Sequence, residues 1–192
     1  MTLYQAVASR QASRITPLDV VAVVAGSLLL TLSAKVQVPF YPVPMTMQTF
    51  VVIGLGLALG PVRGLAALAL YLAQGALGLP VFSGTPERGI GLAYMAGPTG
   101  GYLAGYLLAV PLAGWLAGRG WDRNVFSAML AALLAAAVIY IPGLLWLGSL
   151  VGFDQVLAFG LYPFIPGDIA KAVLAAIAFP AAWNWLSHKG MN

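Results

Sequence analysis

The sequence predicts an all-α, polytopic membrane protein with six transmembrane helices and both termini in the cytoplasm. Of its 192 residues, 61% are hydrophobic and only 7% are charged, and the mean hydropathy is +0.92. A soluble domain carries about 25% charged residues, because its surface must face water. The apolar residues also gather into runs of roughly 15 to 25, a length that crosses about 30 Å of hydrocarbon as a helix. This composition excludes both a soluble fold and low-charge disorder.

Six apolar runs define the expected helices. They cover residues 18–34, 47–60, 62–77, 101–117, 125–150 and 169–186. The second and third runs are short and are separated only by Pro61, which predicts a tight hairpin or a pair of helices that does not span fully. The expected organisation is a cytoplasmic segment over residues 1–17, a membrane domain over 18–187 and a cytoplasmic tail over 188–192.

The basic residues predict the orientation, because Lys and Arg favour the cytoplasmic side of a membrane. With six helices and the N-terminus inside, the cytoplasmic set is Arg10, Arg14, Arg63, Arg119, Arg123 and Lys189. The outer set is only Lys35 and Arg88, with Lys171 near the start of the last helix. No apolar stretch precedes Arg10, so we expect no cleavable signal peptide. The chain is therefore expected to be a multi-pass protein of the plasma (inner) membrane.

Several function classes lack the residues that they need. The chain has no cysteine, and its single histidine, His188, lies in the polar tail, so we expect no metal site and no thiol or histidine catalysis. It contains no G-x-x-x-x-G-K-[ST], H-E-x-x-H or G-x-S-x-G motif. Its nine Lys and Arg residues form no basic run that would favour nucleic acid. We expect no enzyme and no cofactor, and an energy source supplied by a partner or a gradient.

The segments placed outside are long and rich in proline and aromatic residues. They cover residues 36–45, 79–97 and 151–167. Pro39, Pro42 and Pro44 stiffen the first segment, because each proline fixes its own φ angle and lacks an N–H donor. Stiff aromatic loops suit the wall of a binding site. The alternative is that they are interfacial connections carrying the aromatic residues that gather at membrane surfaces.

Asp168 and Lys171 are ionisable residues at membrane depth, where a charge costs about 2.5 to 3.5 kcal/mol on insertion scales. Pro166 and Gly167 precede an apolar run, so we expect Asp168 as the N-cap of the last helix and Lys171 at its third position. An ammonium group beside the positive end of a helix dipole forms an anion site. The pair would suit a small zwitterion-like or amide-plus-carboxylate ligand. The alternative is an N-cap with a neighbouring salt bridge.

Further residues are candidates for the same outer cavity. Arg88 is a second cation there, unless it simply pairs with Glu87 at the surface. Thr46, Gln48 and Thr49 follow the proline-rich loop at the mouth of the second helix. A small-molecule pocket usually combines an apolar wall with a few polar groups. The aromatic candidates for that wall are Phe40, Tyr41, Phe82, Tyr94 and Tyr102.

Four stretches of the sequence together resemble one known family. They are VPFYPVPMTMQT at residues 38–49, GLPVFSG at 78–84, GPTGGY at 97–102 and GDIAK at 167–171. In this order they resemble BioY, the biotin-specific substrate-binding (S) subunit of energy-coupling-factor transporters. The resemblance covers most of the chain from Leu18 to Leu186. It implies a six-helix membrane protein that captures biotin at its outer face, under the loops after its first, third and fifth helices.

The resemblance also implies residue roles and partners. The family's acidic and lysine positions on the last helix match Asp168 and Lys171. Our hypothesis is that Lys171 pairs with the valerate carboxylate of biotin and that Asp168 accepts from its ureido N–H groups. Family members dock a transmembrane coupling subunit through small residues on the first helix, which here are Ala22 and Gly26. ATPase subunits would then drive uptake across the surrounding lipid.

Two other interpretations stay open beside biotin uptake as an S subunit. The same pocket could belong to a self-sufficient secondary carrier or channel for a small anionic vitamin. A structural membrane scaffold, whose outer loops bind another protein, would bind no small molecule at all.

Overall fold

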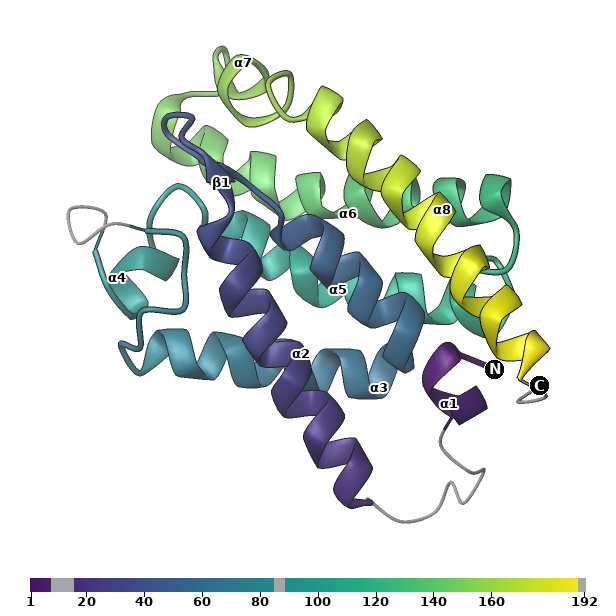
Figure 1. Cartoon of the computed structure of the whole chain (residues 1–192). Helices are drawn as coiled ribbons and strands as arrows, with labels where there is room; N and C mark the ends of the chain where they lie inside the picture. Colours follow the sequence, from purple (N-terminus) through teal and green to yellow (C-terminus); the bar gives the residue numbers. More distant parts are fainter. Residues whose placement is uncertain (8–15, 85–88, 190–192) are drawn as a thin grey trace.

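The computed structural model describes residues 1–7, 16–84 and 89–189, and its regular structure is almost wholly helical (Figure 1). Its helices are α1 (Leu3–Val7), α2 (Pro17–Lys35), α3 (Gln48–Ala76), α4 (Leu92–Met95), α5 (Gly100–Gly118), α6 (Val125–Val151), α7 (Val156–Gly160) and α8 (Ile165–His188). One short antiparallel pair of strands, β1 (Gln37–Val38) and β2 (Met45–Thr46), lies between α2 and α3. Five helices, α2, α3, α5, α6 and α8, are long and apolar enough to cross a membrane. The expected all-α membrane class is confirmed. Three of the basic residues named above, Arg10, Arg14 and Arg88, lie outside the described residues.

The N-termini of two long helices are capped by side chains next to the expected apolar runs. Thr16 caps α2, and the Asp19 carboxylate accepts from the Thr16 backbone N–H at 2.7 Å in return. Asn124 caps α6 by accepting from the backbone N–H of Phe126 at 2.9 Å. These caps satisfy N–H groups that have no partner inside the helix, so both helices begin within two residues of the expected position.

Helix α3 is two helical arms, residues 48–60 and 61–76, that fold back on each other. Gly60 has φ 80° and ψ 178°, a conformation outside the helical region, and Pro61 follows it. In a straight helix Gln48 and Tyr71 would lie about 35 Å apart, yet the Gln48 Nε2 donates to the Tyr71 hydroxyl at 2.6 Å. The break expected at Pro61 is confirmed, and so is the hairpin form of that expectation.

Helix α8 begins earlier than the sequence suggested. It starts at Ile165, after Phe164, and the Asp168 backbone N–H already donates to the Phe164 carbonyl at 2.9 Å. Asp168 is therefore the fourth residue of the helix rather than its N-cap, and Lys171 lies one turn further in. The N-cap prediction was wrong because a proline is well tolerated in the first turn of a helix, where its missing N–H is not needed. Asp168 still lies in that first turn, where the helix dipole favours a negative charge.

Glycines let the helices approach closely. Helix α5 packs between α3 and α6, and α6 in turn packs against α8. A Cβ atom at Gly105 would lie 2.6 Å from the carbonyl oxygen of Ile139 on α6, and one at Gly56 would lie 2.7 Å from the Cβ atom of Ala113 on α5. A larger residue at either position would overlap the neighbouring helix, so glycine is needed where these helices cross.

The expected docking role of Ala22 and Gly26 stays a prediction, but the two residues differ in burial. Gly26 is buried against α3, where an added Cβ atom would lie 2.9 Å from both the Ala67 Cβ atom and a methyl group of Leu55. Ala22, one turn earlier, is half-buried. Gly26 therefore packs against α3 inside the protein, while Ala22 remains partly accessible.

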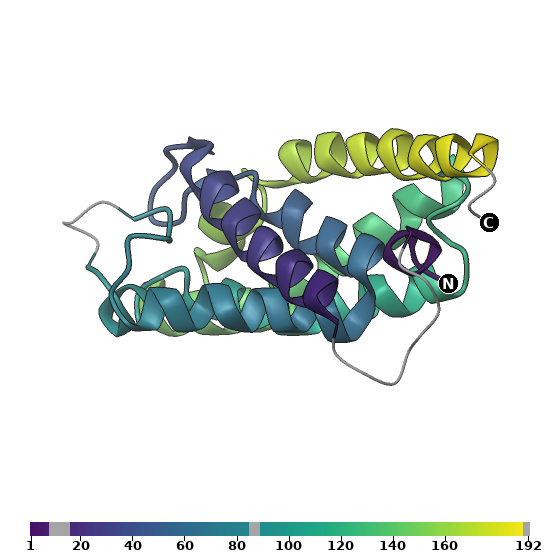
Figure 2. The ribbon, with the colours of Figure 1, turned by 60° about the horizontal axis from the view of Figure 1, so that its bottom comes forward.

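The bundle has two different ends (Figures 1 and 2). At the terminal end, the Met1 amine donates to the carbonyl oxygen of Gly118 at 3.4 Å, and α8 ends nearby. At the same end the Asp19 carboxylate accepts from the Tyr4 hydroxyl at 2.6 Å and from the Arg63 guanidinium, which ties α1 to α2 and α3. The loop end carries the β1–β2 hairpin, α4 and α7, so the segments expected on one side of the membrane do gather together.

Candidate binding site

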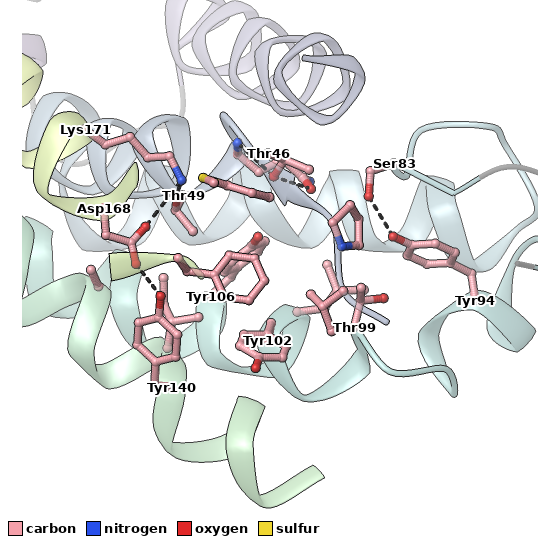
Figure 3. Close-up of a pocket in the computed structure, with 18 residues that line it drawn as sticks. Thr46, Thr49, Ser83, Tyr94, Thr99, Tyr102, Tyr106, Tyr140, Asp168 and Lys171 are labelled. Atoms are coloured by element: carbon pink, nitrogen blue, oxygen red, sulfur yellow. Dashed lines mark hydrogen bonds and ion pairs between the residues drawn. The ribbon is translucent and has the colours of Figure 1, made fainter. Parts of the chain in front are cut away.

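A cavity lies at the loop end, enclosed by the β1–β2 hairpin, the first arm of α3, α5, α6 and α8 (Figure 3). Its free volume, counting the part open to solvent, is about 580 Å³, within the roughly 300 to 1,000 Å³ of small-molecule sites. Polar side chains of the lining are Thr46, Gln48, Thr49, Ser83, Tyr94, Thr99, Tyr102, Tyr106, Tyr140, Asp168 and Lys171. Its apolar side chains are Val43, Pro44, Met45, Leu103, Ala136, Ile139 and Phe164.

One end of the cavity is charged. The Lys171 ammonium lies 3.3 Å from Asp168 Oδ1 and donates to the Thr49 hydroxyl at 2.8 Å. The Tyr140 hydroxyl donates to the other carboxylate oxygen, Asp168 Oδ2. The Lys171 and Asp168 side chains are only 9% and 11% exposed, so their mutual attraction is little screened by water. An ammonium has three donors, and a carboxylate has about four acceptor positions. The bonds described above do not use all of them, so donors and acceptors remain available for a ligand.

The opposite end of the cavity is polar but uncharged. The hydroxyl groups of Ser83 and Tyr94 are hydrogen-bonded at 2.7 Å, and Thr99 lies beside them (Figure 3). Among the described residues that line the cavity, Asp168 and Lys171 carry the only charges. Lys35 reaches the neighbouring segment, where its ammonium donates to the carbonyl oxygen of Phe82 at 2.6 Å.

Aromatic rings form the wall between the two ends. Tyr106 and Tyr102 come from α5, and Phe164 comes from the start of α8. The Tyr102 hydroxyl donates to the carbonyl oxygen of Gly160 at 2.8 Å, which anchors this ring to α7. The arrangement places aromatic rings between a donor–acceptor pair at one end of the cavity and hydroxyl groups at the other (Figure 3). No group of three or more His, Asp and Glu side chains among the described residues is placed to hold a metal ion.

Seven of the candidate residues named from the sequence line this cavity. They are Asp168, Lys171, Thr46, Gln48, Thr49, Tyr94 and Tyr102. Phe82 is buried behind the lining, stacked on Tyr94 with ring centroids 4.9 Å apart. Tyr41 is 85% exposed and lies outside the lining. Arg88 lies outside the described residues.

Four polar lining residues were not singled out from the sequence. Ser83 and Thr99 fall within two of the quoted motif stretches, and this was a usable signal. Tyr106 and Tyr140 lie within long apolar helices, where the only hint is that a hydroxyl group at membrane depth needs a hydrogen-bond partner. Their neighbours across helices cannot be read from spacing along the chain.

The model of the BioY family matches residues 8–188, which is nearly the whole sequence. The chain belongs to the BioY family. Among its curated relatives, a probable biotin transporter BioY of Pyrococcus horikoshii is 41% identical over 149 residues, covering 78% of this chain and 86% of that protein. A biotin transporter BioY of Rhizobium etli is 38% identical over 156 residues, covering 77% of this chain and 82% of that protein.

The BioY fold is also found in a solved structure. The crystal structure of the S-component for biotin from an ECF-type ABC transporter matches this chain with a TM-score of 0.75. The match covers 89% of this chain and 95% of that chain at 24% sequence identity. The bundle described above is therefore the fold of that S-component.

Proposed function

We propose that this BioY-family chain binds biotin in the loop-end cavity and serves as the S component of an energy-coupling-factor transporter for biotin uptake. Support comes from family membership and from the names of the relatives, which are biotin transporters. The observation that carries the proposal is the charged pair, Asp168 and Lys171, buried at one end of a cavity walled by aromatic rings. The relatives are named as transporters, so we propose no catalytic role for this site.

The proposed orientation places the loop end outside and both termini in the cytoplasm of the cell. The two arms of α3 then count as separate passages, which gives six in total. Support comes from the basic residues Arg63, Arg119, Arg123 and Lys189, which all lie on segments at or next to the terminal end. Arg63 and Arg119 stack on the rings of Tyr4 and Trp115, and such cation–aromatic groups suit a lipid headgroup region.

The chemistry of biotin suits the two ends of the cavity. Its cyclic urea holds each N–H group beside the carbonyl oxygen, so one edge presents a donor and an acceptor together. The Asp168 carboxylate can accept from that N–H while the Lys171 ammonium donates to the carbonyl oxygen. The bicycle and the aliphatic chain would lie along the aromatic wall. The carboxylate of biotin would then reach the hydroxyl groups of Ser83, Tyr94 and Thr99.

This assignment reverses our sequence-based hypothesis that Lys171 pairs with the carboxylate of biotin. Asp168 and Lys171 together carry no net charge, and both are nearly buried. Adding a carboxylate to this pair would leave a net negative charge in apolar surroundings, which is costly. A neutral urea adds hydrogen bonds without adding charge.

Affinity measurements with two ligands test the assignment. We expect Lys171→Met to weaken binding of biotin and of biotin methyl ester by the same factor, about tenfold or more, because the urea is common to both and a hydrogen bond to a charged group contributes about 1.5–3 kcal/mol. Calorimetry on the purified protein in detergent gives both dissociation constants. If Lys171 binds the carboxylate instead, Lys171→Met will weaken the binding of biotin but not that of biotin methyl ester.

A control separates loss of a contact from loss of the fold. Removing one partner of a buried ion pair can destabilise a protein by about 3–5 kcal/mol. Thermal unfolding without ligand must therefore stay cooperative in Lys171→Met, and Asp168→Asn provides a second variant at the same end of the cavity. Failure of the unaltered protein to bind biotin would end the proposal itself.

The proposed partners are a transmembrane coupling subunit and ATPase subunits. Support comes from the sequence, which has no phosphate-binding loop and so needs energy from elsewhere. Uptake of labelled biotin into liposomes separates this from a self-sufficient secondary carrier. We expect no accumulation by the chain alone, with or without a proton gradient. Accumulation driven by the gradient would favour the carrier.

A further inference from the structure

Two hydroxyl groups hold the charged pair from opposite sides. On α6, the Tyr140 hydroxyl donates to Asp168 Oδ2. On the first arm of α3, the Thr49 hydroxyl accepts from the Lys171 ammonium at 2.8 Å. The carboxylate and the ammonium themselves sit on α8, three residues apart. Three helices therefore meet at this pair, and each charge is bonded to a different neighbouring helix.

The contact between the two charges is longer than a usual charge-assisted hydrogen bond. Charge-assisted hydrogen bonds between an ammonium and a carboxylate are usually about 2.7–2.9 Å long. Lys171 lies 3.3 Å from Asp168 Oδ1, longer than that range, whereas its bond to Thr49 falls within it. Both side chains are about nine-tenths buried, where opposite charges attract strongly. Without another partner for each charge, the two would close into a tight contact pair.

The Tyr140 ring is well placed to keep its bond. It packs edge-on against Tyr102, with ring centroids 6.1 Å apart, and the Tyr102 hydroxyl is fixed to the carbonyl oxygen of Gly160. The bond to Asp168 therefore comes from a ring that is itself positioned by α5 and α7. Thr49 lies in the first turn of α3, directly after Gln48, whose amide is bonded to Tyr71. The Tyr140 ring and the first turn of α3 are thus each fixed by contacts with other parts of the bundle.

We infer that Tyr140 and Thr49 are positioning residues that keep the Asp168–Lys171 pair open, so that one edge of a cyclic urea can bind to both charges at once. This rests on the proposed function and deepens it. A closed ion pair would have to be broken before the ligand could bind, and that cost would be subtracted from the affinity. A pair held open in advance binds without it, which is the general advantage of pre-organisation.

The two hydroxyl groups act on the same pair, so their removal should not be additive. We expect Tyr140→Phe and Thr49→Val each to weaken biotin binding about tenfold, because either loss lets the pair close. The double variant should bind biotin with about the same affinity as the single variant that binds it less tightly. Independent effects on packing or on the ligand would instead multiply to about a hundredfold. Multiplication, or no change in either single variant, would overturn the inference.

Stability without ligand distinguishes positioning from a structural role. Closing the ion pair compensates for the lost hydrogen bonds, so the unfolding temperature of the ligand-free variants should stay near that of the unaltered protein, while the rise on adding biotin becomes smaller. A fall in the ligand-free unfolding temperature with an unchanged rise would mean a structural role and would overturn the inference. Thr49→Ser keeps the hydroxyl group and should restore the unaltered affinity.

Matched controls use the same chemical changes elsewhere. Thr31→Val removes a hydroxyl group that donates to the Ser27 carbonyl on α2, and Tyr162→Phe alters a ring that is 58% exposed. Neither should change the affinity for biotin. If Tyr140→Phe does not fold, Thr49→Val paired with Thr49→Ser still carries the test. Absence of biotin binding by the unaltered protein would reject the proposed function, whereas intact binding in both single variants would reject only this inference.

Discussion

Tyrosine hydroxyl groups supply much of the polar bonding inside this apolar bundle. Those of Tyr71, Tyr94, Tyr102 and Tyr140 all bond to other residues at or behind the cavity. A tyrosine suits this role because its ring packs like an apolar residue while its hydroxyl bonds at one point. At the residue scale, the sequence singled out Asp168 and Lys171, because charged residues are rare in this chain. It did not single out Tyr140, because the chain has eight tyrosines and their spacing does not say which of them face a cavity.

The Gln48–Tyr71 bond supports a prediction at this scale. Gln48 lines the cavity and is buried, and its amide donates to the Tyr71 hydroxyl, which is fully buried. We expect Tyr71→Phe to lower the free energy of unfolding by about 1–3 kcal/mol, because a buried amide donor loses its acceptor. Denaturation in detergent measures the change, with Tyr162→Phe as the exposed control. An unchanged stability would mean that Gln48 finds another acceptor.

At the scale of elements, α3 shows how local sequence sets a long-range arrangement. A glycine followed by a proline breaks the helix, and the break reverses its direction, so that Gln48 and Tyr71 meet. This element was predictable, because the residues that cause the break are adjacent in the chain. The start of α8 was predicted four residues too late. Proline signals a boundary, but only the tertiary structure decides on which side of it the helix begins.

The Gly60 conformation supports a prediction at the element scale. At φ 80° and ψ 178° it occupies a region that is essentially restricted to glycine, and a residue with a side chain there costs about 1–3 kcal/mol. We expect Gly60→Ala to lower the stability by that amount, measured by unfolding in detergent. Gly118→Ala is the matched control, because its Cβ atom would meet nothing within 4 Å. Equal stability of the two variants would contradict the strained turn.

At the scale of the whole molecule, the two ends of the bundle differ in charge and in shape. At the terminal end, the turn within α3 and the α5–α6 connection are short and lie beside basic residues, while the loop end carries the β1–β2 hairpin, two short helices and the cavity. The sequence anticipated this division from the positions of Lys and Arg. It could not anticipate that Gly26 packs inward, because the partner of a small helix face depends on how the helices associate.

The absence of cysteine in the chain allows a direct test of the proposed orientation. Four exposed positions report on the two ends: Tyr41 and Leu77 at the loop end, and Val62 and Gly118 at the terminal end. We expect a membrane-impermeant maleimide to label Tyr41→Cys and Leu77→Cys in intact cells. Val62→Cys and Gly118→Cys should react only after permeabilisation. Labelling of Val62→Cys in intact cells would contradict the proposal that the arms of α3 turn in the cytoplasm.

The sequence by itself determined the membrane class, the break in α3 and the two charged residues that line the cavity. These depend on composition and on residues adjacent in the chain, which act through solvent preference and local stereochemistry. Only the tertiary structure decided which residues surround those charges. Tyr140 and Thr49 lie 28 and 122 residues from the side chains that they bond, and Tyr41 faces away while Tyr94 faces the cavity. Contacts over such separations depend on how the helices pack, which no local pattern encodes.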